Sequence, residues 1–102
     1  MVILYLTCAN GTEAKTIANA LLETQLIACA RRSSVSSSYW WDGQIHHDEE
    51  VLLMMESLEE KFSEIEVIVT KLHSYKEYVL TMIPVLKTTP GVHKWLDSTL
   101  EK

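Results

Sequence analysis

The chain has 102 residues, a length that suits one domain over residues 1–102 and leaves no room for a second. Hydrophobic residues make up 47% of it, a share typical of folded proteins and well above that of disordered chains. The net charge of −5 gives nucleic-acid binding no electrostatic support, because phosphate backbones select basic surfaces.

The first predicted elements are a strand and a helix. Residues 2–8 form a continuous apolar run, which is typical of a strand buried on both faces. Asn10 can cap a helix and Glu13 can reach back to its first turn, so a helix should begin there and end near Thr24. Its apolar stripe consists of Ala14, Ile17, Ala18, Leu21 and Leu22.

The next predicted feature is a long hairpin. From residue 28 the pattern is extended, and Asp42-Gly43 is a strong turn signal because glycine adopts positive φ without steric cost. The return strand should run from about residue 45 to residue 56, and its first part, 46–50, is polar on both faces. This part is therefore expected to leave the core as a hairpin arm. On the outgoing strand one face carries Val35, Ser37, Tyr39 and Trp41, and the other carries Ser36, Ser38 and Trp40.

A second helix, a third apolar run and a short last helix complete the chain. Ser57-Leu58-Glu59-Glu60 fits a capping box, and the helix that follows should end near His73. Residues 78–86 are apolar, and Pro84 indicates a sheet edge or a bulge there. Thr89-Pro90 should start the last helix, which carries Val92, Trp95 and Leu96. The apolar stripe of the second helix consists of Leu58, Phe62, Ile65, Val69 and Leu72.

The order βαββαβ plus a C-terminal helix predicts an α+β fold of the ferredoxin-like type, the split βαβ sandwich. Helices cover only one face of such a sheet, yet residues 2–6, 51–55 and 79–83 are almost uninterrupted apolar runs. A single chain lacks the residues to cover the second face. We therefore expect a homo-oligomer that buries sheet against sheet.

The location expected from the sequence is cytoplasmic, without membrane contact. No apolar run approaches the roughly 20 residues of a membrane span. The apolar opening is short and lacks the basic start of a signal peptide. Cys8 and Cys29 are too few for a disulfide framework, and buried thiols are the simpler interpretation.

The chain resembles a known family, the CutA divalent-cation tolerance proteins, along nearly its whole length. Taken in order and at their spacing, the pieces are specific. The stretches that carry the resemblance are AKTIANALLETQLIACA, YWWDGQIHHDEEVLL, KLHSY and HKWL. Ser74 and Glu56 depart from it, because the family usually has Pro and Lys there, and Tyr78-Val79 stands in place of Pro-Glu.

The resemblance implies a ferredoxin-like homotrimer whose hairpin arm pairs with neighbouring subunits. It also implies tolerance of copper or other divalent ions, with no metal required for folding and no securely assigned reaction. Cys29 and His73 match family motif positions, and a thiolate with an imidazole suits copper or zinc. The alternative is that Cys29 packs in the core and His73 simply ends the second helix near its negative pole.

Two further groups are candidate sites. His46, Asp48 and Glu50 share one face of a strand and could hold a divalent ion weakly, although a solvated hairpin tip is the simpler interpretation. Tyr39, Trp41 and Tyr75 could form the aromatic wall of a small-molecule cleft between subunits, or simply pack there.

The function expected from these residues is metal binding or metal tolerance by a non-catalytic trimer. No glycine-rich phosphate loop is present, and no serine lies beside an expected base and acid. The alternative is a signalling or scaffold trimer that binds a small ligand or a protein partner in clefts between subunits, as the similarly built PII proteins do.

Overall fold

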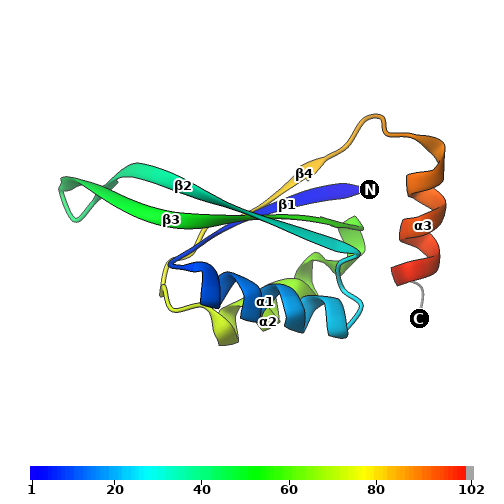
Figure 1. Ribbon diagram of the computed structural model, residues 1–102, viewed down its shortest axis with the longest axis horizontal. Coiled ribbons are helices and arrows are strands. Elements are labelled where there is room, and N and C mark those ends of the chain that lie inside the picture. The colour runs from blue at the N-terminus through cyan, green and yellow to red at the C-terminus, as the bar shows by residue number, and fades with distance from the viewer. Residues whose placement is uncertain (101–102) are drawn as a thin grey trace.

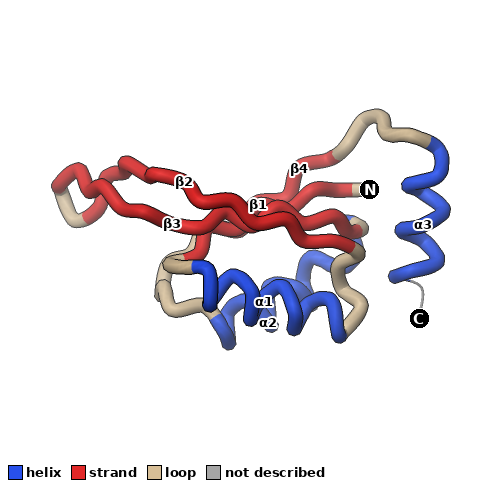
Figure 2. The backbone as a smooth tube through the Cα atoms, viewed as in Figure 1, coloured by secondary structure: helices blue, strands red, loops and turns tan. Residues whose placement is uncertain are grey.

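The computed structural model describes residues 1–100 and contains the predicted order of elements, with one four-stranded antiparallel sheet. Both α1 and α2 lie on one face of this sheet, and α3 lies beyond its end (Figure 1). The two layers are clearest in the backbone view (Figure 2). The ferredoxin-like α+β fold is thus confirmed, with strand order β2-β3-β1-β4. The elements are β1 (Val2–Cys8), α1 (Gly11–Glu23), β2 (Cys29–Trp41), β3 (Gln44–Ser57), α2 (Phe62–Leu72), β4 (Leu80–Pro84) and α3 (Pro90–Leu100).

The core lies between the sheet and the two helices. Along β1 every second side chain is fully buried against the helices, as Leu4 and Leu6 illustrate. Each such burial contributes about 1.5–3 kcal/mol relative to exposure. The stripe predicted for α1 is confirmed except at Leu22, which is 39% exposed, and in α2 the buried pair is Ile65 and Val69.

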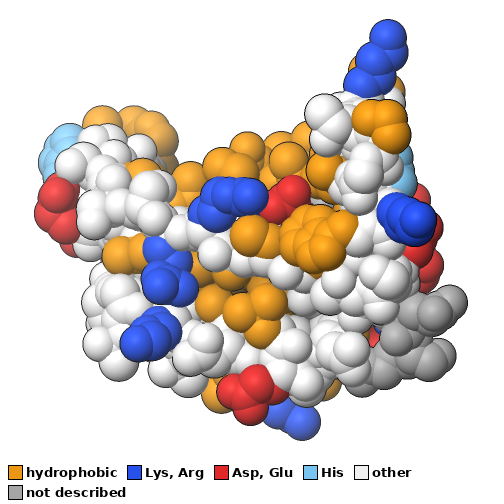
Figure 3. Space-filling view, turned by 45° about the vertical axis from the view of Figure 1, so that its right-hand side comes forward, with side chains coloured by type: hydrophobic (Ala, Val, Ile, Leu, Met, Phe, Trp, Pro, Cys, Tyr) orange, Lys and Arg blue, Asp and Glu red, His pale blue; other side chains and the backbone are white. Residues whose placement is uncertain are grey.

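The opposite face of the sheet carries no helix, and we call it the open face. The register places Tyr5 of β1 between Met54 of β3 and Thr81 of β4, so these side chains share that face. Ile3 and Ile83 form the next cross-strand pair. Hydrophobic side chains gather along this side, between the arm and the C-terminal segment (Figure 3). The central strands are therefore apolar on both faces, as their sequences indicate.

The hairpin turns where the sequence predicts. Asp42 and Gly43 have φ angles of 53° and 76°, and Trp41 pairs with Gln44 across them. Two positive φ values in a two-residue loop match the twist of the flanking strands. Because β1 pairs only with residues 51–57 of β3, the rest of the hairpin projects beyond the sheet (Figure 1). We call residues 35–50 the hairpin arm.

The predicted capping box at Ser57 is wrong. Ser57 is the last residue of β3 and pairs with Val2, and its buried hydroxyl donates to the carbonyl oxygen of Leu26 at 2.6 Å. Helix α2 instead begins through a 3-10 turn at Glu59–Lys61, with no side-chain cap. The serine is used in the core because the chain after α1 leaves a buried carbonyl that needs a donor.

The last two elements follow the prediction with narrower limits. Strand β4 is shorter than the apolar run 78–86, and it lies at the sheet edge, where Pro84 requires no ladder hydrogen bond. Helix α3 begins at Pro90 as expected and buries Leu96 and Leu100. The last turn of α3 is bonded to the loop after α1, because Nε2 of Gln25 donates to the carbonyl oxygen of Thr99 at 3.1 Å.

Candidate functional site: an aromatic cavity beside the hairpin arm

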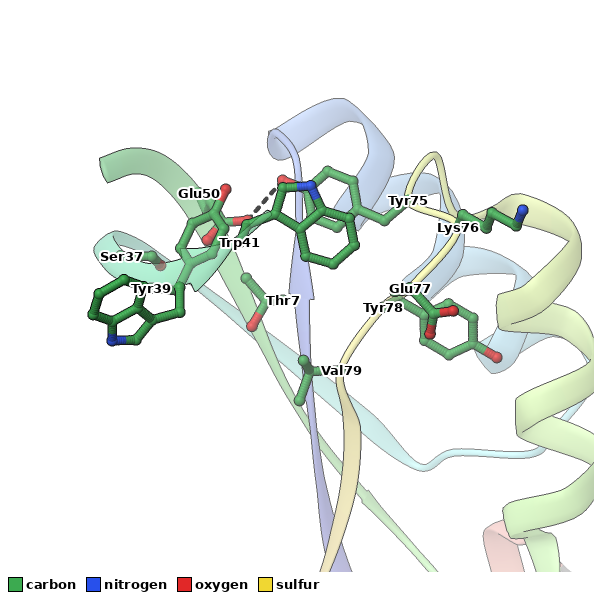
Figure 4. Close-up of a pocket in the computed structure, with 11 residues that line it drawn as sticks. Thr7, Ser37, Tyr39, Trp41, Glu50, Tyr75, Lys76, Glu77, Tyr78 and Val79 are labelled. Carbon is green, nitrogen blue, oxygen red and sulfur yellow. Dashed lines mark hydrogen bonds between the residues drawn. The ribbon is translucent and has the colours of Figure 1, made fainter. Parts of the chain in front are cut away.

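A cavity of about 720 Å³ lies where the hairpin arm leaves the sheet. Its walls come from the arm, from Thr7 near the end of β1, and from the segment 75–79 that precedes β4 (Figure 4). Tyr39, Trp41 and Tyr75 all line it, so the three residues predicted to form a cleft do come together. Trp40, which the strand pattern places on the other face of β2, also borders the cavity.

Glu50 and Tyr75 meet inside this cavity. The Tyr75 hydroxyl donates to Oε2 of Glu50 at 2.6 Å, as the dashed line in Figure 4 marks. Glu50 is only 7% exposed. Burial, followed by the hydrogen bond and negative charge of Glu50, raises the pKa of Tyr75 well above its usual value. The phenol therefore remains a protonated donor at all physiological pH values.

The outer part of the arm carries a second tyrosine–carboxylate pair. The Tyr39 hydroxyl donates to Oδ2 of Asp48, and this bond is the main cause of the raised pKa of Tyr39. The His46 ring stacks on Tyr39 with 5.9 Å between ring centroids. The register confirms that His46, Asp48 and Glu50, which are every second residue of β3, share one face of the strand. Among residues 1–100, however, no three His, Cys, Asp or Glu side chains gather in a way that could hold a metal ion.

His73 is fully occupied by the protein itself. The Tyr75 backbone N–H donates to Nδ1 at 3.0 Å, so Nε2 carries the proton and donates to the Thr7 carbonyl oxygen at 2.8 Å. The imidazole is fully buried and stacks on Tyr78 at 5.3 Å between ring centroids. In this arrangement neither ring nitrogen offers a free lone pair to a metal ion.

Cys29 lies far from His73 within one chain. Cys29 pairs with Glu56, which pairs with Ile3 at one end of β1, whereas His73 contacts Thr7 near the other end. Ile3 and Thr7 are four residue steps apart along β1, or about 13 Å. The Cys29 thiol is half-buried, and burial raises its pKa, with Glu56 adding to the shift and Arg31 opposing it.

Sequence reasoning assigned Glu50 only to a metal site and overlooked its place in the cavity. A usable signal was present, because the Asp42-Gly43 turn pairs Trp41 with Gln44 and so places Glu50 opposite Val35. That register puts Glu50 on the same face as Tyr39. The contributions of Thr7 and Tyr78 had no comparable signal, since they depend on how distant segments pack.

The fold and site define a class: a ferredoxin-like α+β protein with a projecting hairpin arm and an aromatic cavity at its base. The model of the family described as CutA1 divalent ion tolerance protein matches residues 2–99. The chain belongs to this family.

Individual relatives match this chain along nearly the whole length of both sequences. The divalent-cation tolerance protein CutA of Archaeoglobus fulgidus is 33% identical over 98 residues, which cover 96% of each chain. That of Thermotoga maritima is 33% identical over 100 residues, covering 98% of this chain and 99% of the relative. The solved structure of CutA1 from Pyrococcus horikoshii has a TM-score of 0.94 at 29% identity and covers all of both chains.

The solved structure from Archaeoglobus fulgidus is described as a periplasmic divalent cation tolerance protein. It has a TM-score of 0.96 at 32% identity and covers 99% of this chain and all of that one. Within residues 1–100 of the present chain, no helix has both the length and the apolar character needed to cross a membrane.

Proposed function

We propose that this protein acts in tolerance of divalent metal ions, with copper as the preferred ion, as a non-catalytic homotrimer in the cytoplasm. The observation that carries the proposal is the match to the CutA1 divalent ion tolerance family over residues 2–99. Two curated relatives that span nearly the whole chain are named divalent-cation tolerance proteins. Metal handling, rather than a reaction, is the activity that these names describe.

The residues of one chain supply only part of a metal site. Cys29 offers a thiol on the open face, and Glu56 opposite it offers a carboxylate, a combination that suits a copper or zinc ion incompletely. His73 would have to give up two hydrogen bonds before it could bind a metal. We therefore propose that the ion binds at Cys29, with further ligands from a neighbouring copy of the chain.

Equilibrium dialysis tests the metal proposal. Reduced, tag-free protein is dialysed against equimolar copper, zinc, nickel and cobalt with a weak competing chelator, and bound metal is counted by mass spectrometry. We expect selective retention of copper that is lost in Cys29→Ser and kept in Cys8→Ala. Cys8 is the matched control, because its thiol is fully buried on the helix side of the sheet. Retention that does not depend on Cys29, or no selective retention, contradicts the proposal.

The trimer is proposed because the open face needs a cover. Ile83 is 42% exposed there, whereas its neighbours Leu80 and Met82 pack against the core on the other face of the strand. Light scattering at micromolar concentration should give the mass of three chains. A charge placed on the open face by Ile83→Lys should shift the protein toward monomer. The control Val67→Lys should not, because Val67 is 54% exposed but lies on α2, on the opposite side of the molecule. A monomeric parent protein would refute the assembly.

The cavity favours a second candidate function, the binding of a small ligand by a signalling trimer. Its volume of about 720 Å³ falls within the range of ligand sites, and aromatic side chains with a few polar groups line it. This candidate predicts thermal stabilisation by a metabolite. About 2.7 kcal/mol is expected at a ligand concentration one hundred times the dissociation constant. A screen in which only copper stabilises the protein would contradict it.

A further inference from the structure

The cavity contains one acceptor atom that the protein does not use. Oε2 of Glu50 accepts the Tyr75 hydroxyl, but Oε1 has no hydrogen-bond partner among residues 1–100. The residue is nonetheless 93% buried, being 7% exposed, and its carboxylate faces the cavity. Among the described residues no fully buried side-chain oxygen or nitrogen lacks a partner, so Oε1 is open to the cavity, where the N–H group of a ligand can reach it.

The walls around this carboxylate are aromatic. The rings of Trp41 and Tyr75 lie together at the Tyr75 end of the Glu50–Tyr75 hydrogen bond, and Tyr39 lies near Glu50 on its other side (Figure 4). Aromatic faces attract cations through their negative π surface, and tryptophan does so best. They also contact alkyl groups favourably, so the walls suit a ligand with a positive head and an apolar body.

The charge around the cavity also selects a cation. Its charged lining residues are Glu50, Glu77 and Lys76. The ammonium group of Lys76 points away from Glu50 and out of the cavity (Figure 4). The Asp48 carboxylate, which accepts the Tyr39 hydroxyl, lies two residues from Glu50 on the same face of β3. The interior is therefore negative, which disfavours phosphates and carboxylates as ligands.

We propose that this cavity binds a primary alkylammonium ion, with the ammonium group donating to Oε1 of Glu50 and the alkyl chain packed against Trp41 and Tyr39. The inference rests on the second candidate function and names its ligand class. A divalent metal fits less well, because among the described residues Glu50 belongs to no group of three or more His, Cys, Asp and Glu side chains that could hold one. A quaternary ammonium fits the walls but has no N–H for the free oxygen.

Three probes of similar size separate the contributions of the positive charge, the N–H donor and the alkyl chain. The n-butylammonium ion has both charge and N–H donors, the tetramethylammonium ion has charge without a donor, and n-butanol has the alkyl chain without charge. Each is titrated into ¹⁵N-labelled protein while the indole N–H signals of the tryptophans are followed by NMR, with sodium chloride matching the ionic strength. Trp40 and Trp41 border the cavity, whereas Trp95 lies on α3 and serves as an internal reference.

We expect n-butylammonium to shift the Trp41 signal saturably, to leave Trp95 unchanged, and to bind more tightly than either other probe. Glu50→Gln should weaken this binding by about tenfold, the usual value of a hydrogen bond to a charged group. Glu49→Gln is the matched control, since Glu49 is the next residue of β3 on the opposite face and accepts from Ser36. It makes the same change in charge outside the cavity and should bind as the parent does.

A variant with a low risk of unfolding supports the test. Trp41 is 56% exposed, so Trp41→Leu should fold normally and should lose most of the preference of the cavity for n-butylammonium over n-butanol. The proposal is overturned if tetramethylammonium or n-butanol binds as tightly as n-butylammonium. It is also overturned if Glu50→Gln binds as the parent does, or if only zinc or copper shifts the Trp41 signal. If light scattering shows that the parent protein is not a trimer, the proposed assembly fails. That failure is distinct from a failure of alkylammonium binding, which the NMR titration measures.

Discussion

Ser74 donates two hydrogen bonds to one carboxylate, that of Glu13, which lies 61 residues earlier in the chain. The Ser74 backbone N–H bonds to Oε1 at 2.6 Å, and its hydroxyl bonds to Oε2 at 2.9 Å. The same carboxylate accepts the Ala9 backbone N–H at 3.1 Å. Glu13 therefore joins the start of α1 to the end of α2. A proline at position 74 could supply neither donor.

Substitution of Ser74 by proline should destabilise the fold. Ser74→Pro removes both bonds, at about 1 kcal/mol each, although the stiffer unfolded chain offsets up to about 1 kcal/mol. Ser74→Ala removes only the hydroxyl and should cost about 1 kcal/mol. Urea unfolding at one fixed protein concentration measures both. Ser63→Ala, an exposed serine of α2, is the control and should change the free energy of unfolding by no more than about 0.5 kcal/mol. Unchanged stability in both Ser74 variants would contradict the role of the pair.

The Glu13 link should make stability depend on pH in the acid range. Burial by itself would raise the pKa of Glu13, but the bonds from Ser74 and Ala9 outweigh it and hold the pKa below the usual 4.5. A lowered folded-state pKa means that the stabilisation is complete above the unfolded-state pKa and is lost as the pH falls through the folded-state value. Glu13→Gln should therefore be less stable than the parent at pH 7. The difference should shrink steadily below about pH 4 in urea titrations, whereas a difference constant with pH would contradict this account.

A side chain at Gly43 should strain the turn of the hairpin. Gly43→Ala should destabilise the protein by about 1–2 kcal/mol, because φ is +76° there and an L residue is strained in that region. Gly11→Ala is a matched control. Both glycines have open space where a Cβ would stand, but only Gly43 has a positive φ. Gly11→Ala should be neutral or stabilising by up to about 1 kcal/mol. Equal effects in thermal unfolding would show that φ is not the deciding factor.

The carboxylate of Glu56 should restrain the reactivity of Cys29. Burial is the main cause of the raised Cys29 pKa, and Glu56 raises it further by charge and by a hydrogen bond. Glu56→Gln should therefore lower that pKa and speed alkylation of Cys29 by iodoacetamide at pH 8, because the thiolate is the reactive form. Peptide mass spectrometry counts the product. Cys8 is the internal reference, since burial raises its pKa to about 12 and it should stay unmodified in both proteins. Slower alkylation of Cys29 in the variant would contradict the assigned direction.

Local sequence patterns account for most of the architecture. Asn10 caps α1 by accepting the Glu13 backbone N–H at 2.9 Å, and Asp42-Gly43 makes the two-residue turn. The alternation along β3 correctly places His46, Asp48 and Glu50 on one face. The failure at Ser57 is instructive, because its neighbours match a capping box while the residue itself satisfies a carbonyl after α1. A buried acceptor 31 residues away outweighed a local preference.

By itself the sequence determined the order of the elements, the hairpin and its turn, and the apolar character of both sheet faces. These follow from periodicity, capping and turn chemistry, which act over a few residues. Only the tertiary structure decided that Glu13 meets Ser74, that both His73 nitrogens are occupied, and that Glu50 shares a cavity with Tyr75. Such contacts join segments that are far apart in the chain, so they depend on how the helices and strands pack and not on any local pattern.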